Sequence, residues 1–360
     1  MLRVFTVVHG IGTRGECVNY REAAEVRFGN AAIRPMPGTL HALPWAAGGK
    51  YRVGEVLCES FWMPPFRDGA PQAACTRRAA RTQLERLSAL GYQLMSGYEA
   101  EFFVYRKDGD GAAIDRPMFD GVDVFSSLLL AERDELILSV CEGLSDAGVD
   151  VAAMQTEYAP GQLEFALGTK FGVASADQMF TLKEAVKELC FRRGWTATFM
   201  TRPTTSDRPG CSSGMHFSGS LWADGKNAFH DPESGRLSAA GRHWAAGLVK
   251  HAGALTALVC PTVNCYRRLH GGPFAPGRAD CGLEDRNAML RVVASSPRMT
   301  YVENRLPSGA ANPYLVLAAT VAAGIDGLVN RLELPAGDSD DERRGETLAS
   351  SLSEALQGVV

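Results

Sequence analysis

The sequence predicts an α+β fold in which antiparallel strands carry most of the chemically interesting residues. Short β-rich runs alternate with helical periodicities along the 360 residues, and we find no internal repeat. Hydrophobic residues make up 46% of the chain and charged residues 22%, a composition typical of globular proteins that argues against disorder. The length corresponds to one large domain or two ordinary ones.

The N-terminal region is expected to form short strands that end near residue 62. The run 2–8 is rich in β-forming residues, and 51–61 is a second strand region whose apolar members include Val56 and Leu57. Prolines between these two runs mark turns, because proline fixes its backbone and donates no hydrogen bond.

A helix is predicted to begin near Thr76, whose hydroxyl can cap the first turn. Leu84, Leu87 and Leu90 recur at helical spacing, and Gly91 is a natural C-terminal stop. This helix leads from the N-terminal strands into the larger part of the chain.

The rest of the chain alternates predicted strands and helices. We expect strands at 98–105, 196–200 and 215–221, a strand pair at 156–167, and helices at 126–144, 177–193, 239–258, 312–329 and 348–356. The buried stripe of one helix would consist of Met179, Leu182, Val186 and Leu189. Asn312 followed by Pro313 is a strong helix start signal. The segment 336–346 is acidic and expected to be solvated.

Charge and cysteine content exclude several classes of protein. Lysine and arginine number 37 against 41 acids, so the net charge of −4 gives no electrostatic reason to expect nucleic-acid or anionic membrane partners. The nine cysteines include no CxxC pair and predict neither a zinc site nor a disulfide framework. The apolar stretch 314–329 is shorter than the ~20 residues of a membrane span, and no signal peptide is found. We expect a reduced, soluble, cytoplasmic protein.

Four glutamates are predicted to project from neighbouring strands. Glu99 and Glu101 are two residues apart in one strand, so both carboxylates lie on the same face. Glu157 and Glu164 flank the turn sequence YAPGQL, which would return the second acid beside the first. Two glutamates at positions i and i+2 of a strand are also typical of the solvent-exposed face of a half-buried sheet.

Two later residues complete this acidic set, namely His216 in SSGMHFSGSL and Glu303 in YVENRLP. Five carboxylates converging on one imidazole require a compensating charge, because an unpaired buried carboxylate is very costly. Two divalent cations that prefer oxygen ligands, Mg²⁺ or Mn²⁺, would supply that charge. A lone histidine is otherwise usually a satisfied core or surface group.

A second set of residues is cationic, and it consists of Arg267, Arg268, Arg286, Arg291 and Arg305. Forked guanidinium groups suit carboxylates and phosphates, although ordinary surface ion pairs would also account for each arginine alone. Glu303 and Arg305 share one predicted strand face, which would place a metal ligand beside an anion clamp. The sequence contains neither a Walker loop nor a GxGxxG motif, so the P-loop and Rossmann classes are not expected.

Six blocks in the chain together resemble the glutamine synthetase family from about residue 30 onward. They are YEAEFF (98–103), EYAPGQLE (157–164), TATFMTRP (196–203), SSGMHFSGSLW (212–222), PTVNCYRRL (261–269) and ENRLPSGAANPYL (303–315). Segments 241–265 and 311–328 are most similar to lengsin, the vertebrate lens branch. The resemblance implies a partial β-grasp-like N-terminal domain at 1–62. It also implies a glutamine synthetase-type catalytic domain at 63–360, with a curved antiparallel sheet and outer helices.

The resemblance implies activation of the glutamate γ-carboxylate by ATP and Mg²⁺ (or Mn²⁺), followed by attack of ammonia or an amine. Glu101, Glu157 and Glu164 would hold one metal, and Glu99, His216 and Glu303 the other. Arg268 would bind glutamate, while Arg286 and Arg305 would contact substrate and stabilise charge in the transition state. Ser220 and Arg291 would bind ATP.

Several departures from the family pattern leave a second hypothesis open. Phe274 stands where the family usually has a glutamate that helps to deprotonate ammonium, Arg202 replaces a lysine, and Ser212 and Ser218 replace a glycine and a histidine. The alternative is a catalytically silent, lengsin-like structural protein with intermediate-filament partners. The family also implies a homo-oligomeric ring. The N-terminal domain is expected to be partly present and the C-terminus to be truncated.

Overall fold

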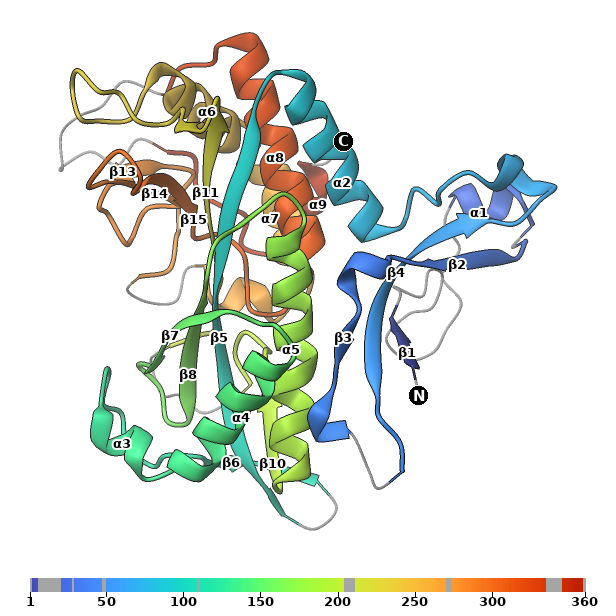
Figure 1. Cartoon of the computed structure of the whole chain (residues 1–360). Helices are drawn as coiled ribbons and strands as arrows, with labels where there is room; N and C mark the ends of the chain where they lie inside the picture. Colours follow the sequence, from blue (N-terminus) through green and yellow to red (C-terminus); the bar gives the residue numbers. More distant parts are fainter. Residues whose placement is uncertain are drawn as a thin grey trace.

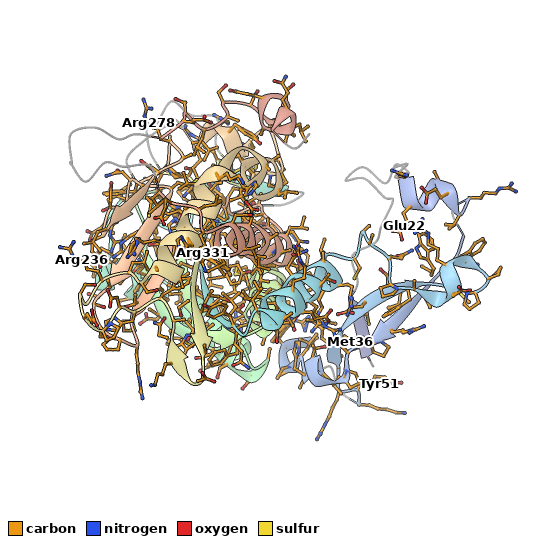
Figure 2. All side chains as sticks on the ribbon, turned by 90° about the horizontal axis from the view of Figure 1, so that it is seen from above. Glu22, Met36, Tyr51, Arg236, Arg278 and Arg331 are labelled. Atoms are coloured by element: carbon orange, nitrogen blue, oxygen red, sulfur yellow. The ribbon has the colours of Figure 1, made fainter. Side chains whose placement is uncertain are left out.

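A computed structural model describes residues 2–5, 21–27, 29–46, 50–108, 111–203, 211–269, 274–334 and 345–358. It contains a small N-terminal sheet and a large sheet that is covered by helices, so the predicted α+β class is confirmed (Figure 1). Viewed from above, the N-terminal sheet stands to one side of the main body (Figure 2). Most of the acidic segment predicted at 336–346 lies outside the described residues.

The N-terminal sheet is built around β4 (Gly54–Trp62), which confirms the strand predicted at 51–61. β1 (Leu2–Phe5) pairs with β4 in parallel, whereas β2 (Ala31–Pro35) and β3 (His41–Ala42) pair with it antiparallel. The short helix α1 (Arg21–Glu25) packs on the end of β4 through Ala23, Val26 and Trp62. This unit therefore has its own small apolar cluster.

The large sheet has its central strands in the order β13-β14-β15-β11-β5-β8-β7. Their bounds are Cys281–Leu283, Leu290–Ala294, Thr300–Asn304, Met215–Ala223, Gln93–Asp108, Gln162–Leu167 and Val151–Thr156, respectively. The additional strands β6 (Gly111–Pro117), β9 (Lys170–Phe171) and β10 (Trp195–Thr198) pair with β5, and β12 (Lys226–Asn227) pairs with β11. Among the described strands of this sheet, the pairs are antiparallel except for β13 with β14.

Helices cover the face of the large sheet that looks toward the N-terminal unit (Figure 1). They are α2 (Thr76–Ala89), α4 (Asp134–Asp146), α5 (Ala174–Arg192), α6 (Ala239–Lys250), α7 (Ala252–Val259) and α8 (Pro313–Asn330), with the shorter α3 (Ser127–Ala131) and α9 (Leu352–Gln357) at the periphery. Tyr98, Ala100 and Phe102 of β5 are fully buried in this layer. Because side chains alternate along a strand, Glu99 and Glu101 project from the opposite face.

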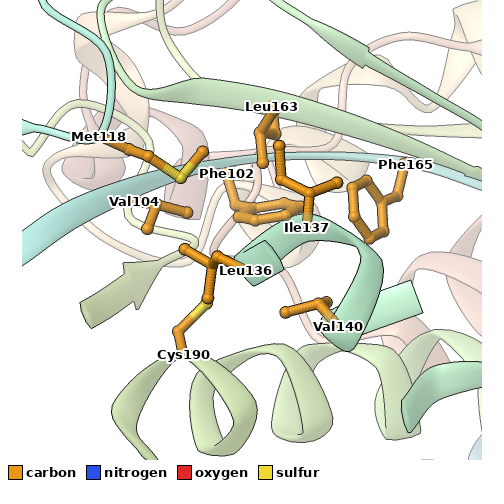
Figure 3. A pocket seen from close by; sticks show the side chains of 9 residues that line it. All are labelled: Phe102, Val104, Met118, Leu136, Ile137, Val140, Leu163, Phe165 and Cys190. Carbon is orange, nitrogen blue, oxygen red and sulfur yellow. The ribbon is translucent and has the colours of Figure 1, made fainter. Parts of the chain in front are cut away.

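The core between β5 and the helices is closely packed. A cavity of about 10 Å³ remains beside Phe102, Val140 and Cys190, and its lining is entirely apolar (Figure 3). This volume is close to that of a single water molecule by the same measure, so the cavity is too small for a ligand. The four apolar residues predicted to form the stripe of α5 are fully buried, which confirms that assignment.

Helix α8 is the hydrophobic centre of the helical layer and packs against α2 and α6. Asn312 accepts hydrogen bonds from the backbone N–H groups of Tyr314 and Leu315, so the predicted start is confirmed. Within the described residues, α8 is long and apolar enough to meet the length and composition criteria for a membrane span. Its buried fraction of 61% identifies it as a core helix of this fold.

Three local predictions are wrong, and tertiary contacts explain two of them. The helix predicted at 126–144 is broken at Arg133, whose Nε donates to the Met118 carbonyl at 3.1 Å. The helix predicted at 239–258 is broken at His251, whose Nε2 lies 2.8 Å from an Asp326 oxygen. Thr76 is the first helical residue of α2 and Cys75 is its N-cap, so the hydroxyl does not cap the helix.

A buried ionic network joins the N-terminal sheet to the helices. Arg77 of α2 donates to Glu59 of β4 at 2.6 Å and to both oxygens of Asp177 on α5 at 2.8 and 2.9 Å. The Tyr314 hydroxyl of α8 donates to the same Asp177 carboxylate at 2.8 Å. The network therefore joins β4, α2, α5 and α8.

Candidate metal-dependent active site

Strand register brings the predicted acidic residues together on the open face of the large sheet. β11 lies between β5 and β15, with His216 directly opposite Glu99 on β5. Glu303 on β15 is opposite Ser218, two residues along β11 from His216. On the other side of β5, Glu101 pairs with Glu164 on β8. Four adjacent strands thus contribute to one cluster.

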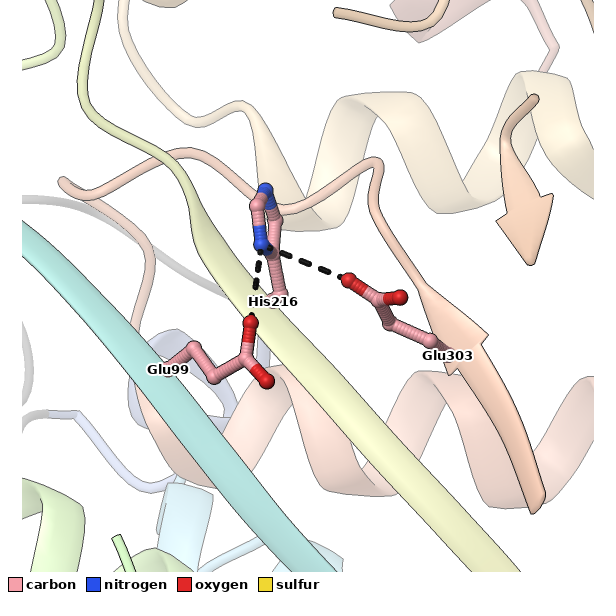
Figure 4. Close-up of side chains that lie close together, drawn as sticks. All are labelled: Glu99, His216 and Glu303. Atoms are coloured by element: carbon pink, nitrogen blue, oxygen red, sulfur yellow. Dashed lines mark hydrogen bonds and ion pairs between the residues drawn. The ribbon is translucent and has the colours of Figure 1, made fainter. Parts of the chain in front are cut away.

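The His216 imidazole is at the centre of this cluster (Figure 4). Its Nδ1 atom is 3.4 Å from a carboxylate oxygen of Glu99 and 3.4 Å from one of Glu303. Its Nε2 atom is 3.6 Å from a carboxylate oxygen of Glu101. The side chain of His216 is only 6% exposed, and guanidinium nitrogens of Arg268 and Arg305 also lie 3.3 and 3.5 Å from its Nε2 and Nδ1 atoms.

Two overlapping groups have their potential ligand atoms within 4.8 Å of one another, namely Glu99 with His216 and Glu303, and Glu101 with Glu164 and His216. Glu157 lies beside the second group. Gln155 donates to Glu164 at 2.9 Å and to Glu157 at 3.3 Å, and so bridges the two carboxylates. Sequence reasoning did not identify Gln155, although its position two residues before Glu157 could have indicated a shared strand face.

The electrostatics of the cluster fit a site for divalent cations. Burial, reinforced by Glu99 and Glu101, raises the pKa of Glu164 to about 9. Burial, followed by the charge of Glu101, raises the pKa of Glu157 to about 7. The ionised carboxylates therefore repel one another in a buried setting. Bound cations would offset this repulsion.

His216 is in the protonation state that a metal ligand needs. Burial and the nearby Arg305 guanidinium lower its pKa to about 3, so the imidazole is neutral at physiological pH. Neutral imidazole and carboxylates are together a suitable donor set for Mn²⁺ or Mg²⁺. The residues present thus fit the metals that the sequence predicted.

Two predicted arginines hold Glu303 from either side. Arg291 Nη1 donates to one oxygen of Glu303 at 3.2 Å, and Arg305 Nη1 donates to the other. Arg305 also donates from Nε to the Arg286 carbonyl at 3.0 Å and from Nη2 to the Phe274 carbonyl at 3.2 Å. The Arg305 guanidinium is 4% exposed and is fixed by three acceptors, whereas Arg286 as a residue is exposed.

Arg268 lies behind His216 and is 3% exposed. Its guanidinium donates to the carbonyls of Leu306 at 3.3 Å and Arg305 at 3.0 Å, and its Nη2 is 3.3 Å from His216 Nε2. Burial lowers its pKa from the ordinary arginine value. The structure therefore places Arg268 against the cluster, with two of its contacts directed to backbone rather than to open space.

The remaining residues that the sequence singled out are Ser220, Arg202, Ser212 and Ser218. Ser220 is buried further along β11 and accepts a hydrogen bond from Trp222 Nε1 at 3.0 Å. The backbone N–H and carbonyl of Arg202 both bond to the Asn264 amide, at 2.8 and 2.9 Å. Ser212 and Ser218 are the two other departures from the family pattern. Both are partly buried, and both lie near His216 in the sequence.

Gly214 is a site residue that sequence reasoning did not identify. Its N–H donates to a Glu101 oxygen at 2.8 Å. A Cβ at this position would lie 2.9 Å from both Arg268 Nη2 and His216 Nε2, so a larger residue would displace one of them. Glycine thus allows the backbone to approach the cluster closely.

Comparison with known proteins identifies the family to which this site belongs. A family model described as "Glutamine synthetase, catalytic domain" matches residues 73–359. The chain belongs to this family. The predicted resemblance to glutamine synthetases and to the lengsin branch is confirmed by the similarities that follow.

Curated members of the glutamine synthetase family align with most of the chain. The glutamine synthetase of Thermotoga maritima is 33% identical over 91% of this chain and 74% of its own length. The gamma-glutamylethanolamide synthetase of Streptomyces coelicolor is 34% identical over 86% of this chain and 65% of its own length. Human lengsin is 32% identical over 86% of this chain and 58% of its own length. The chain therefore spans less than two thirds of the length of several relatives.

Solved structures support the same family assignment. The apo structure of GmaS has a TM-score of 0.79 and 30% sequence identity, and the match covers 91% of this chain and 75% of that one. A GmaS complex with ADP has a TM-score of 0.80 and 27% sequence identity, and the match covers 99% of this chain and 86% of that one. The shared fold thus includes the small N-terminal unit as well as the large sheet.

Proposed function

We propose that this chain is an ATP-dependent ligase that activates the γ-carboxylate of glutamate as an acyl phosphate and joins it to ammonia or an amine. The observation that carries the proposal is the convergence of Glu99, Glu101, Glu164 and Glu303 on the neutral imidazole of His216. The names of relatives support this chemistry, since they include glutamine synthetases, a gamma-glutamylethanolamide synthetase and a glutamate–isopropylamine ligase.

The acidic cluster would hold two divalent cations, Mg²⁺ or Mn²⁺. Glu99, His216 and Glu303 would hold one, and Glu101, Glu157 and Glu164 would hold the other, with His216 also within reach of the second group. When bound, such cations would neutralise the negative charge of the phosphate groups. Gln155 would orient the carboxylates of Glu157 and Glu164 through its two hydrogen bonds.

Arg305 is the group best placed to stabilise negative charge during phosphoryl transfer. Hydrogen bonds to Glu303, to the Arg286 carbonyl and to the Phe274 carbonyl hold its guanidinium in position. A charge fixed before the reaction costs no reorganisation in the transition state. Arg286 would assist Arg305 from the exposed side, and Arg268 would bind the glutamate carboxylate.

Nucleotide contacts are proposed for Ser220 and Arg291. Hydrogen bonds to Glu284 and Glu303 raise the pKa of Arg291 and counter the effect of burial, so the guanidinium stays charged. Since Glu303 is shared by Arg291 and Arg305, a change at this carboxylate would affect phosphate binding and phosphoryl transfer together.

A catalytically silent, lengsin-like scaffold remains the second candidate. The observation that favours it is an apolar side chain, Phe274, at a position where the family usually has an acid. Such a scaffold would assemble as a homo-oligomeric ring and bind cytoskeletal partners such as intermediate filaments. For either candidate we propose a cytoplasmic location, which is supported by the eight cysteines in the described part of the chain, all of them unpaired.

The test measures phosphate release from ATP and Mg²⁺ with and without glutamate, and then with ammonia or a panel of amines. We expect glutamate-dependent release, and a loss of at least about 100-fold in Glu303→Gln, which keeps the shape of the side chain but removes its charge. Glu184→Gln on the outer face of α5 is the control and should retain full activity. Metal-dependent nucleotide binding without glutamate-dependent turnover would contradict the ligase and favour the scaffold.

A further inference from the structure

We propose that Tyr158 and Phe274 form the acceptor side of this site, and that they select a primary amine with an apolar or aromatic substituent over ammonia. This inference rests on the proposed ligase function. The two rings have centroids 5.6 Å apart and are tilted by 36° to each other. They come from the turn between β7 and β8 and from the loop before β13, which the fold brings together.

Both rings remain open to solvent. Tyr158 is 44% exposed and Phe274 is 39% exposed, and neither belongs to the hydrophobic core. A pair of exposed aromatic rings is a poor contributor to stability and a common feature of binding sites. Since the pair borders a cluster of carboxylates, a ligand that combines a cationic amine with an apolar group would match both surfaces.

The backbone of Phe274 has an unusual conformation and forms hydrogen bonds with Asn287 and Arg305. Its φ angle of +65° lies in the left-handed region, which is rare for a bulky side chain. Its N–H donates to Asn287 Oδ1 at 3.1 Å, and its carbonyl accepts from Arg305 Nη2 at 3.2 Å. Arg305 therefore contacts the backbone from which the Phe274 ring projects, and a backbone conformation of this kind is typical of functional sites.

Tyr158 connects the same aromatic pair to the acidic side of the site. Its backbone N–H donates to Glu157 Oε2 at 3.2 Å. Glu157 is linked to Glu164 through Gln155. The aromatic pair thus extends from the glutamates at one edge of the cluster to Arg305 at the other, and an amine bound on the rings would face both.

An aromatic surface on the acceptor side affects which nucleophile the site favours. Ammonium is small and strongly hydrated and buries no carbon, so it gains little from an apolar surface. An alkyl or aryl amine can bury its carbon atoms on the rings, which is favourable in proportion to the apolar surface removed from water. A cationic amine is also attracted to aromatic faces as it enters.

The proposed step is an acyl transfer. The neutral amine nitrogen attacks the γ-carbonyl carbon of the acyl phosphate, a C–N bond forms, and the C–O bond to phosphate breaks. Inorganic phosphate leaves with the bonding electron pair. Of the two protons that the ammonium form of the amine loses, one leaves with phosphate and the other passes to water. ATP, the co-substrate of the proposed ligase, supplies the phosphoryl group.

The experiment separates this inference from the ligase proposal. Hydroxylamine, a small nucleophile, first traps the acyl phosphate as γ-glutamyl hydroxamate. Values of kcat/KM are then measured for ammonia, methylamine, n-butylamine and benzylamine with saturating ATP, Mg²⁺ and glutamate, and products are verified by mass spectrometry. We expect benzylamine or n-butylamine to exceed ammonia by at least about 10-fold, the scale on which apolar contacts discriminate substrates.

Variants then assign the preference to the two rings. Phe274→Ala and Tyr158→Ala should each lower the ratio of benzylamine to ammonia about 10-fold, mainly through the KM for the amine. Phe274→Tyr should restore the ratio because it keeps the ring, and Phe274→Glu should shift the preference toward ammonia. Phe191→Ala, an exposed phenylalanine on α5 that is 61% accessible, is the matched control and should leave the ratio unchanged.

Each outcome decides between the two proposals. If hydroxamate forms but ammonia is the best amine, or the alanine variants keep the wild-type ratio, the inference is overturned and the ligase stands. If neither the hydroxamate nor any γ-glutamyl amide forms with the wild-type protein, the ligase proposal fails and the inference fails with it. A preference for bulky amines that both ring deletions abolish supports the inference.

Discussion

His216 on β11 lies directly opposite Glu99 on β5, and its Nδ1 atom is 3.4 Å from a carboxylate oxygen of that residue. The same nitrogen is 3.4 Å from Glu303, while Nε2 is 3.6 Å from Glu101. One imidazole therefore belongs to both groups of potential metal ligands. This shared position makes His216 the residue whose loss should affect the whole site.

His216→Ala is expected to weaken Mn²⁺ binding by at least about 10-fold and to reduce any metal-dependent activity by a similar or larger factor, because even partners of metal ligands contribute 10- to 100-fold. Titration calorimetry with MnCl₂ measures the affinity. The matched control is His251→Ala, since His251 is paired with Asp326 in the helical layer. Equal Mn²⁺ affinity in wild type and His216→Ala would contradict the metal assignment.

Glu164→Gln is expected to stabilise the metal-free protein, by an amount that grows between about pH 5 and pH 9. Burial and neighbouring carboxylates raise the pKa of Glu164 to about 9, compared with 4.5 in the unfolded chain. Between these values the folded protein retains a proton that the unfolded chain has lost, so wild-type stability falls as pH rises, by at most about 1.4 kcal/mol per pH unit. The glutamine variant lacks this contribution.

Urea unfolding in the presence of EDTA at several pH values measures this difference. Lys183, whose pKa burial lowers to about 7, and Glu157 also titrate in this range, but both proteins contain them. Because the carboxylates of Glu157 and Glu164 interact, the difference between the two proteins reports Glu164 together with its effect on Glu157. With saturating Mn²⁺ we expect the order of stability to reverse, because the variant loses a ligand. A difference that does not change with pH would argue against the raised pKa.

Arg77→Ala is expected to destabilise the protein by about 3–5 kcal/mol, because it leaves buried carboxylates without their main partner. Glu59 and Asp177 have side chains that are 1% and 15% exposed, and Arg81 would still contact Glu59 at 3.1 Å. The loss should therefore lie toward the lower end of that range. Urea unfolding followed by circular dichroism gives the value.

The neighbouring Arg78 provides a matched control for this experiment. Arg78 pairs with Glu85 at 3.2 Å on the surface, where the two side chains are 29% and 52% exposed. Removal of an exposed pair of this kind should change stability by no more than about 1 kcal/mol. If Arg78→Ala and Arg77→Ala lowered the free energy of unfolding by similar amounts, the buried network would not be what stabilises the junction between the N-terminal sheet and the helices.

Gly327→Ala is expected to destabilise the protein by about 1–3 kcal/mol through overpacking. A Cβ on Gly327 of α8 would overlap the carbonyl oxygen of His243 on α6, so the two backbones approach too closely for a side chain. Gly253 of α7 is the control, because its added Cβ would find its nearest atom at 3.9 Å. Gly253→Ala should be neutral or stabilise by about 0.4–1 kcal/mol, as measured by thermal unfolding.

Much of the local structure could be predicted from sequence periodicity. The stripe of α5 and the Asn312 cap of α8 depend on residues within a few positions of one another, so a local pattern is sufficient to find them. The breaks at Arg133 and His251 could not be predicted, because their partners, Met118 and Asp326, are distant in the sequence. Long-range hydrogen bonds outweigh helix propensity at both positions.

The sequence by itself determined which residues are available for chemistry: an acidic set that includes Glu99, Glu101 and Glu303, one histidine in its midst, and arginines suited to phosphate. Only the tertiary structure decided which of them meet. The order of β8, β5, β11 and β15 places His216 between carboxylates from three strands, and it brings Phe274 against Tyr158. Side-chain alternation is a local property of a strand, whereas strand neighbours and register are fixed by the burial of one whole face of the sheet.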